Sequence, residues 1–324
     1  MELSIIGVEV EALSDAQRAE ASVPKITGPT QPIFFTSCSR VEIADVQIQN
    51  SPSLTINLNL CTDVKIRHIT IRDDPRVPIS DGIHICASKD IIITDSVFVC
   101  GDDCVAITGV TNWEGISERI IIANCSMQSS SAAVRVGYMA GKVRDVVISN
   151  LTIHNTNRGF TIFAGDDGWV ENVSIQNIIM HTRIYAGDWW GKGEPLVICA
   201  AQSRGRIENI RVRGITAHSE NGAVIVGDAR NVREIVLEDW SIALSHGENH
   251  KLFGGVIDLQ PVVMLPIPTG KAPWLFISEA SGVRVANVRY RAPQINGEAL
   301  PAEAVYQNAE IAIERDIAEN RVNA

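Results

Sequence analysis

Three aspartates, Asp81, Asp102 and Asp103, are the residues of this chain whose types and spacing most directly indicate chemistry. Asp102 and Asp103 follow a glycine and open an alternating apolar run in residues 100–107, and Asp81 stands before a similar run in residues 80–85. If the two runs are equivalent strands in stacked layers, Asp81 lies against Asp103, with Asp102 beside them. Carboxylates gathered in this way are costly unless they bind a metal, share a proton or carry out acid–base chemistry.

A repeated module explains how such distant residues are brought together. It consists of an apolar–x–apolar triplet, a polar pair and a second alternating run, and it starts at Val41, Val64, Ile91, Ile120, Val146, Val173, Ile210, Ile235 and Val283. Short alternating runs indicate strands, and a period near 25 residues is typical of a solenoid whose layers stack at about 4.8 Å. The sequence therefore predicts an all-β fold, a right-handed parallel β-helix. A β-propeller is the alternative, but its blades need about 40 residues each.

A second pattern, x–small–apolar–x–apolar, recurs in six segments and places the candidate site within the layers. The first positions are expected to line one edge of a sheet, in the turn before each strand, and they are Asp81, Asp103, Ala132, Arg158, Glu194 and Asn221. The fourth positions are expected to form a column that faces solvent, and they are His84, Ala106, Arg135, Thr161, Val197 and Val224. An edge that combines acids, a base and an amide indicates a functional surface.

Composition excludes several classes of function. The 324-residue chain has a net charge of −10, and 45% of its residues are hydrophobic but only 5% are aromatic. The acidic balance argues against nucleic-acid or anionic-membrane partners, and no apolar run approaches the ~20 residues of a membrane span. The start of the sequence lacks a secretory signal, and the cysteines fit neither a zinc spacing nor a disulfide framework. A cytoplasmic location is predicted, with an extracytoplasmic one open if the chain is trimmed.

A single β-helix domain is expected over residues 1–324. Its last part, residues 301–324, is rich in Ala and Glu and carries apolar side chains at Val305, Ile311, Ile313 and Ile317. We predict that this segment forms a C-terminal helix that covers the end of the solenoid.

The aspartate motifs also resemble a known family. Ser80-Asp81-Gly82, Gly101-Asp102-Asp103-Cys104 and the strands around them are similar to family 28 glycoside hydrolases, the polygalacturonase family, from about residue 32 to about residue 244. The resemblance implies a parallel β-helix that hydrolyses pectic polysaccharide with inversion, without a metal or other cofactor. It implies that Asp102 is the general acid and that Asp81 and Asp103 are bases that activate water. Such carboxylates typically stand about 6.5–9.5 Å apart, and their mutual repulsion raises the pKa of one of them.

The chain departs from the family pattern in the following layers. The family usually has Gly-His-Gly one layer after the paired aspartates, where residues 131–133 are Ser-Ala-Ala. Its Arg-Ile-Lys, which binds the substrate carboxylate, aligns with Thr-Ile-Phe at residues 161–163. These departures predict an atypical branch of the family. The N-terminal part of the family's usual domain is also expected to be missing.

Further residues are candidate carbohydrate contacts, namely His84, Arg135, Arg158, Trp189, Trp190, Lys192 and Glu194. Arg135 and Arg158 stand close to the aspartates in the layers and are expected to replace the missing basic groups, or else to neutralise the acidic edge. His84 is either a proton carrier beside Asp81 or a surface histidine. Residues 188–195 resemble a feature of a less typical branch of the family, and their two tryptophans are either a platform for a sugar ring or buried loop anchors.

Three functional hypotheses remain open from the sequence. The first is a glycosidase that acts on a pectic or related oligosaccharide. The second is a carbohydrate-binding solenoid that has lost catalysis, and the third is a metal-dependent lyase whose carboxylates bind calcium. An insertion around residues 185–194 favours exo over endo action because it would close one end of a groove. The sugar, the linkage and the oligomeric state are not predicted.

Overall fold

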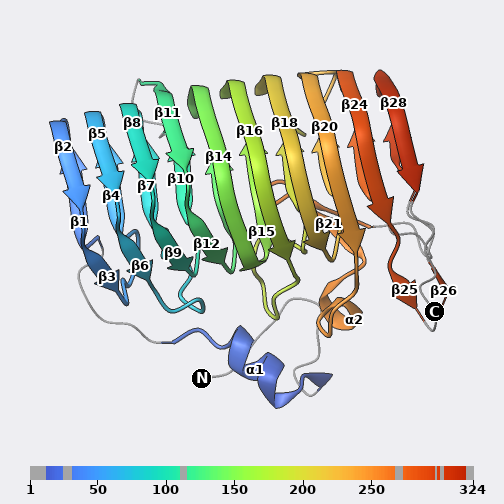
Figure 1. The fold of residues 1–324 in the computed structure, drawn as a ribbon, viewed down its shortest axis with the longest axis horizontal. Helices are drawn as coiled ribbons and strands as arrows, with labels where there is room; N and C mark the ends of the chain where they lie inside the picture. The colour runs from blue at the N-terminus through green and yellow to red at the C-terminus, as the bar shows by residue number, and fades with distance from the viewer. Residues whose placement is uncertain are drawn as a thin grey trace.

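A computed structural model of the chain describes residues 12–24, 31–109, 115–266, 273–295, 298–299 and 303–318. Over these residues the chain winds into a solenoid in which each turn of strands stacks on the turn before it (Figure 1). Equivalent strands of successive turns pair in parallel, as a β-helix requires and a propeller does not. The predicted parallel β-helix is therefore confirmed.

One long sheet carries the strands that follow the candidate site residues. Its order is β1 (Ile33–Thr36), β4 (Ile56–Asn59), β7 (Ile83–Cys86), β10 (Val105–Thr108), β13 (Ala132–Val136), β15 (Arg158–Phe163), β17 (Leu196–Cys199), β19 (Ala223–Val226), β23 (Leu275–Ser278) and β27 (Val305–Gln307). Most residues of these strands that point into the solenoid are Val, Ile, Leu or Phe, and Ala223 is a smaller exception. Such side chains suit a half-buried pleated surface.

The second sheet forms the other faces of the solenoid. Its main path is β2 (Ser39–Ala44), β5 (Thr62–Arg67), β8 (Lys89–Thr94), β11 (Ser117–Ala123), β14 (Lys142–Thr156), β16 (Trp169–Thr182), β18 (Arg206–Ser219), β20 (Val232–Leu244), β24 (Ala280–Arg291) and β28 (Ile311–Ala318). A further row consists of β3 (Gln47–Gln49), β6 (Thr70–Arg72), β9 (Val97–Cys100) and β12 (Ser126–Ser129), and β12 pairs with the far end of β14.

The starts of the predicted module form one continuous ladder inside the solenoid. Each is paired with the next in the sheet register, in the order Val41, Val64, Ile91, Ile120, Val146, Val173, Ile210, Ile235 and Val283. From Val64 onward these side chains are at most 2% exposed. Burial of each removes apolar surface from water, and truncating one of the isoleucines to Ala in such a core costs about 2–5 kcal/mol.

The predicted polar pair of the module stands where the chain turns a corner. At one corner Asp95, Asn124, Asn150 and Asn177 all have φ between 53° and 57°, a conformation that short polar side chains tolerate best. The amide of Asn124 donates to Asp95 at 3.1 Å, that of Asn150 to Asn124 at 3.1 Å, and that of Asn177 to Asn150 at 2.7 Å. We call these four residues the asparagine ladder.

The spacing between module starts is longest from Val173 to Ile210 and from Ile235 to Val283. Both long steps contain insertions and not missing turns. The strands on either side of each step pair directly, β16 with β18 and β20 with β24. The first insertion is the loop 183–195. The second follows β20 and contains α2 (His250–Phe253) and the hairpin β21 (Val256–Asp258) and β22 (Met264–Pro266). Helix α1 (Asp15–Ala21) lies on the same side of the solenoid as α2 (Figure 1).

These added segments cover part of the solenoid. Leu13, Ala21, Ile184, Ala186 and Phe253 form a small core that joins α1, the loop 183–195 and α2. Ile257 and Leu259 of the hairpin region pack on the outer face of β15, β17, β19 and β23.

The fourth positions of the second pattern align in register as predicted. The expectation that the whole column faces solvent is wrong, however, because Thr161, Val197 and Val224 are buried beneath this hairpin region.

The predicted C-terminal helix over residues 301–324 is wrong in its described part. Residues 305–307 form β27, and residues 311–318 form β28, which pairs with β24. Ile311 continues the inner ladder after Val283. Alternating apolar residues that extend an existing sheet outweigh the helical propensity of Ala and Glu. Residues 301–302 and 319–324 of the predicted helix lie outside the described residues.

Candidate active site

The three predicted aspartates lie together at the corner that precedes β7 and β10. The Gly82 amide donates to the carbonyl oxygen of Asp103 at 2.9 Å, so Asp81 and Asp103 occupy equivalent places in adjacent turns. The Asp102 amide donates to the carbonyl oxygen of Ser80 at 3.4 Å. Glycine is required at position 82, because a Cβ there would lie 2.6 Å from the carbonyl oxygen of Cys104.

Arg135 on β13 joins two of the aspartates. Its Nε donates to Oδ2 of Asp103, and its Nη2 lies 3.8 Å from Oδ2 of Asp81. Oδ1 of Asp103 also accepts from the Ala132 amide at 3.1 Å and from the Ser131 hydroxyl at 3.2 Å. We call Asp81, Asp102, Asp103 and Arg135 the aspartate cluster. It places three carboxylates around one guanidinium.

Asp102 is the member of the cluster that borders an open space. It is partly exposed, and one oxygen accepts from the Asp103 amide at 2.9 Å. Burial and the neighbouring Asp103 carboxylate raise the pKa of Asp102 to about 6, and the Arg135 guanidinium opposes this rise. A carboxyl group with such a pKa retains its proton in part of the molecules at near-neutral pH.

Asp81 and His84 form the buried side of the cluster. Burial and the Asp102 and Asp103 carboxylates raise the pKa of Asp81 well above its ordinary value. Nδ1 of His84 lies 3.6 Å from Oδ2 of Asp81, and its Nε2 lies 3.1 Å from the Thr108 hydroxyl. Burial, and then the Arg135 charge, lower the pKa of His84 to about 3. His84 is therefore a neutral, mostly covered imidazole and not a plain surface histidine.

A pocket of about 300 Å³ lies beside Asp102, and its lining residues are Pro78, Ile79, Asp102, Ser131, Asp188, Trp189 and Trp190. Both tryptophans are partly exposed. The ring of Trp190 stacks on Tyr138, with centroids 6.4 Å apart, and Tyr138 lies under the Arg135 guanidinium at 4.9 Å. The tryptophans thus form a wall of this pocket, as a sugar platform requires, and they are not fully buried anchors.

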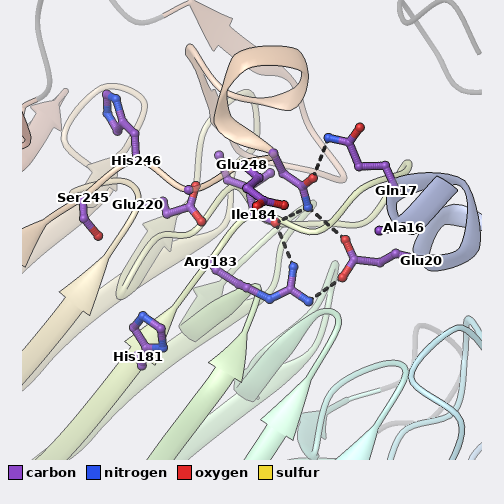
Figure 2. A pocket seen from close by; sticks show the side chains of 12 residues that line it. Ala16, Gln17, Glu20, His181, Arg183, Ile184, Glu220, Ser245, His246 and Glu248 are labelled. Atoms are coloured by element: carbon purple, nitrogen blue, oxygen red, sulfur yellow. Dashed lines mark hydrogen bonds and ion pairs between the residues drawn. The ribbon is translucent and has the colours of Figure 1, made fainter. Parts of the chain in front are cut away.

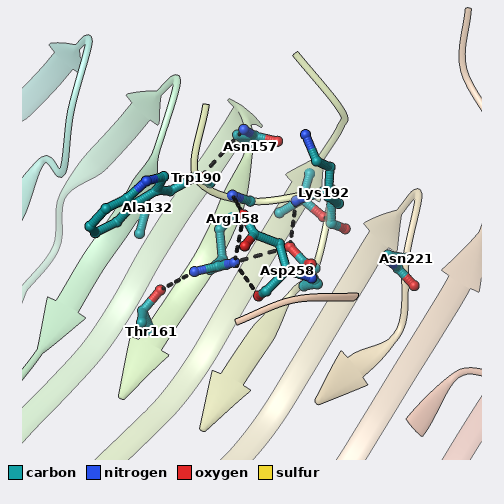
Figure 3. A network of polar contacts seen from close by, with 12 residues as sticks. Ala132, Asn157, Arg158, Thr161, Trp190, Lys192, Asn221 and Asp258 are labelled. Carbon is teal, nitrogen blue, oxygen red and sulfur yellow. Dashed lines mark hydrogen bonds and ion pairs between the residues drawn. The ribbon is translucent and has the colours of Figure 1, made fainter. Parts of the chain in front are cut away.

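Arg158 is placed differently, inside a buried network (Figure 3). Glu194 belongs to the same network and is fully buried. Nη2 of Arg158 donates to the carbonyl oxygen of Asp258 at 2.7 Å, and Nη1 donates to Thr161 at 3.3 Å. Nε of Arg158 lies 3.4 Å from Glu194, which also accepts from the Lys192 amide at 2.7 Å and the Asp258 amide at 3.3 Å. We call Arg158, Glu194 and Asp258 the arginine network. Its contacts fasten the loop 183–195 and β21 to the solenoid.

Arg158 lines a small hollow of about 10 Å³ together with Asp103, Arg135 and Trp190, whereas Glu194 is fully buried. A substrate contact for either residue stays a prediction. Lys192 lines a different pocket of about 180 Å³, together with Gly187, Asp188, Trp189 and residues of the second insertion. Burial lowers the pKa of Lys192. Of the predicted basic groups, only Arg135 is joined directly to the aspartates.

A larger cavity of about 380 Å³ contains none of the predicted site residues (Figure 2). It lies between α1, the end of β16 and the loop 245–249. Glu20 of α1 pairs with Arg183, and the side-chain amide of Asn249 donates to Glu20 at 2.9 Å and to the carbonyl oxygen of Ile184 at 2.9 Å. These polar contacts hold α1 against the solenoid.

Several residues of the site have no signal in the sequence. Asp258 lies in an insertion outside the repeat, so no register relates it to Arg158. Ile79 reaches the pocket from a loop whose path the repeat does not define. Asp188 begins the segment 188–195, in which the family resemblance and the tryptophans are the signals in the sequence, and the aspartate itself is not a candidate. Ser131 is the exception, because it directly precedes Ala132, one of the predicted edge positions. Its place near the site therefore follows from the sequence.

The described residues provide neither a metal site nor a membrane-spanning helix. Within them, no group of three or more His, Cys, Asp or Glu side chains is arranged to hold a metal ion. No helix in the same part of the chain has the length and apolar character of a membrane span. The cytoplasmic location and the lack of a nucleic-acid partner stay predictions.

Comparisons with known proteins match the chain to a family. A family model described as glycosyl hydrolases family 28 matches residues 16–252. A probable polygalacturonase of Arabidopsis thaliana is 27% identical over 237 residues, which cover 68% of this chain and 51% of that protein. A polygalacturonase of Persea americana is 26% identical over 171 residues, which cover 51% of this chain and 35% of that protein. The chain thus spans about half or less of the length of these relatives.

Solved structures share the fold. An exopolygalacturonase from Thermotoga maritima superposes with a TM-score of 0.53 at 18% identity, over 90% of this chain and 55% of that one. A family 28 exopolygalacturonase from Yersinia enterocolitica gives a TM-score of 0.60 at 14% identity, over 84% of this chain and 46% of that one.

Proposed function

Because the chain belongs to glycosyl hydrolases family 28, we propose that it hydrolyses a glycosidic bond in a pectic or related oligosaccharide. The observation that carries this proposal is the position of Asp102. It is a carboxyl group with a pKa of about 6, it borders a pocket of about 300 Å³, and two buried carboxylates lie behind it. The names of the relatives, polygalacturonases, support the substrate class.

In the proposed reaction Asp102 is the general acid. It transfers its proton to the glycosidic oxygen as the bond from that oxygen to the anomeric carbon breaks. A water molecule attacks the anomeric carbon from the opposite face and gives its proton to a carboxylate, so that the configuration inverts. The raised pKa of Asp102 supports this role, since an ordinary aspartate would have lost its proton near neutral pH.

Asp81 and Asp103 are the proposed bases. A raised pKa makes Asp81 a stronger proton acceptor than an exposed aspartate. Asp103 is oriented by the Ala132 amide, the Ser131 hydroxyl and Arg135, which holds its carboxylate in one position. Arg135 lies between the two carboxylates and offsets part of their repulsion.

The experiment that tests this proposal is the Asp102→Asn variant. Loss of a general acid should lower kcat by about 10²- to 10⁴-fold, measured as reducing-sugar release from a panel of pectic fragments. Asp63→Asn is the matched control, because Asp63 is an exposed aspartate on β5 whose left-handed backbone Asn also tolerates. Circular dichroism checks that both variants fold. Retained activity in Asp102→Asn would remove the assignment of the acid.

A second candidate function is carbohydrate binding without catalysis. It is favoured by the Ser-Ala-Ala and Thr-Ile-Phe segments at residues 131–133 and 161–163 and by the engagement of Arg158 inside the protein. Binding of pectic fragments with no release of reducing sugar would select this candidate. A metal-dependent lyase would instead form unsaturated products that absorb in the ultraviolet and would lose activity with a chelator.

A further inference from the structure

The cavity between α1 and the loop 245–249 is separate from the pocket beside Asp102. Its volume is about 380 Å³, and among the described residues it shares no lining side chain with that pocket. Pockets that enclose small organic ligands typically measure about 300–1,000 Å³. The cavity therefore has room for a small organic molecule, and nothing in the proposed hydrolysis uses it.

Glu220 is the most deeply buried charged residue of this cavity. It is 8% exposed, and its Oε2 has no hydrogen-bond partner in the described part of the chain. In Figure 2 its carboxyl group points toward the side of the cavity on which α1 lies. The loop 245–249 lies so close to it that a Cβ at Gly247 would stand 2.4 Å from its Oε1. Buried polar atoms without a partner are rare in folded proteins, so this oxygen indicates a place for a ligand.

Arg183 also lines the cavity, but its donors are engaged by other groups. Its Nη2 donates to Glu20, and its Nε donates to Asn155. Its Nη1 donates to the carbonyl oxygen of Ile184 at 3.2 Å. Glu20 in turn accepts from the Ala186 amide at 2.8 Å. Arg183 and Glu20 therefore neutralise each other, and neither satisfies Oε2 of Glu220.

The adjoining pocket of about 350 Å³ shares Glu20 and Arg183 with the cavity and adds one further ion pair. Its other charged lining residues are Asp74 and Arg76, whose carboxylate and guanidinium groups lie 2.6 Å apart. The two arginines that line these spaces are thus each balanced by a carboxylate.

The remaining titratable groups of the lining leave the cavity with an excess of negative charge. Glu248 is exposed at the cavity, and within the described residues no ion pair joins it or Glu220 to a cation. Burial raises the pKa of Glu220, and the Arg183 charge opposes this rise. Burial lowers the pKa of His181 and of His246, which favours their neutral forms. A positive charge in this space would meet carboxylates and neutral imidazoles.

The donor set suits an organic cation better than a metal ion. No group of three or more His, Cys, Asp or Glu side chains in the described residues is arranged to hold a metal. An ammonium group carries three N–H donors and can be bound by a carboxylate together with neutral acceptors. Oε2 of Glu220, the Ser245 hydroxyl and the His246 imidazole are acceptors of these kinds in the lining.

We propose that this cavity binds a small organic cation whose ammonium group donates to Oε2 of Glu220. The ligand's charge compensates a buried carboxylate that otherwise lacks a cationic partner, and such charge-assisted hydrogen bonds are stronger than neutral ones. The cation has two possible sources, an amino sugar and a plain aliphatic amine, which share the ammonium group. The inference does not rest on hydrolysis at Asp102, because the two spaces are separate.

Ligands that differ in one charged group test the proposal. Calorimetry at neutral pH compares glucosamine with glucose, which has a hydroxyl in place of the ammonium group, and 1,4-diaminobutane represents the plain amines. We expect at least one of the two amines to bind with a Kd at least about tenfold lower than that of glucose. Whichever amine binds more tightly identifies the source of the cation. Equal or tighter binding of glucose, or no binding of either amine, would overturn the proposal.

A variant of Glu220 assigns the binding to this cavity. Glu220→Gln keeps the shape of the side chain but removes its charge, so it should raise the Kd of the tighter amine at least about tenfold. Glu303→Gln is the matched control, because Glu303 is exposed and does not line the cavity. Asp102→Asn is the control for the other pocket and should leave this Kd unchanged. An unchanged Kd in Glu220→Gln, or an equal loss in either control, would contradict the assignment.

A second variant keeps the test open if circular dichroism shows that Glu220→Gln does not fold. Glu248→Gln changes the exposed carboxylate of the same lining and should raise the Kd of the amine by roughly two- to fivefold, as for a solvent-exposed charge pair. An unchanged Kd in Glu248→Gln would then overturn the proposal.

Discussion

The aspartate cluster and the arginine network occupy the same corner of the solenoid a few turns apart, yet they are built for different purposes. In the arginine network the carboxylates of Glu194 and Asp258 meet Arg158 and backbone amides, and all lie out of contact with solvent. In the aspartate cluster and the adjacent His84, buried side-chain atoms of Asp81, His84 and Arg135 have no hydrogen-bond partner among the described residues. Unpaired buried polar atoms are rare in folded proteins, so their concentration beside a pocket indicates function and not stability.

The largest expected effect is a loss of stability when the arginine network is broken. Arg158→Met would leave the Glu194 and Asp258 carboxylates buried without their cation, and should lower the free energy of unfolding by about 3–5 kcal/mol. Urea denaturation measures this change. Arg204→Met is the control, because it breaks the fully exposed Arg204–Asp167 pair and should leave the unfolding midpoint unchanged.

The Arg158 prediction has a second variant in case the first does not fold. Arg158→Lys retains the charge but loses the paired hydrogen bonds of the guanidinium, so it should fold with an intermediate loss of stability. If Arg158→Met were as stable as the wild type, the arginine network would not be a structural clamp.

The aspartate cluster should differ from the arginine network in making activity depend on pH. Asp102 must be protonated to act as an acid, and its pKa is about 6. We therefore expect kcat/KM to fall about tenfold for each pH unit above that value. A rate profile of the wild-type protein against its best substrate measures this limb. Activity that stays constant between about pH 6 and about pH 8 would exclude Asp102 as the acid.

The raised pKa of Asp102 should also make the free energy of unfolding depend on pH. A pKa of about 6 in the folded protein, against about 3.9 for an ordinary aspartate, means that the folded state holds the Asp102 proton more tightly. The contribution of Asp102 to stability therefore falls as the pH rises through this window. Asp102→Asn removes the effect, so the variant should gain about 1–3 kcal/mol relative to the wild type between about pH 4 and about pH 7. Denaturation midpoints at several pH values measure the difference.

The smallest predicted effect concerns Arg135, whose charge lowers the pKa of Asp102. Arg135→Met should move the alkaline limb of the rate profile upward by roughly one pH unit, in whatever activity remains. Arg135→Lys keeps a positive charge at this place, and its limb should stay near that of the wild type. If the alkaline limb of the rate profile moved equally in both variants, the shape of the residue 135 side chain, and not its charge, would determine the pKa of Asp102.

The sequence predicted the repeat better than the parts that interrupt it. The inner ladder from Val41 to Val283 is confirmed because alternating Val and Ile in equivalent turns have one efficient way to be buried. The meeting of Asp81 and Asp103 follows from the same register. The roles of these residues stay predictions.

What the sequence could not predict depends on segments outside the repeat. Asp258 and the hairpin that buries Val197 and Val224 belong to an insertion, whose path is set by tertiary contacts and not by period. The error at the C-terminus has a related cause. Residues 311–318 have a composition suited to a helix, but an existing sheet edge offers them hydrogen bonds and a place for Ile311.

The asparagine ladder has a consequence for how this molecule tolerates change. Its side-chain amides connect one turn of the solenoid to the next. All four residues are exposed, so the loops 183–195 and 245–249 do not cover them. Lengthening or shortening a loop therefore leaves the vertical alignment of the coils intact. We therefore expect that the loops at the rim can change in sequence while the spacing of the acidic groups is kept by hydrogen bonds on another face.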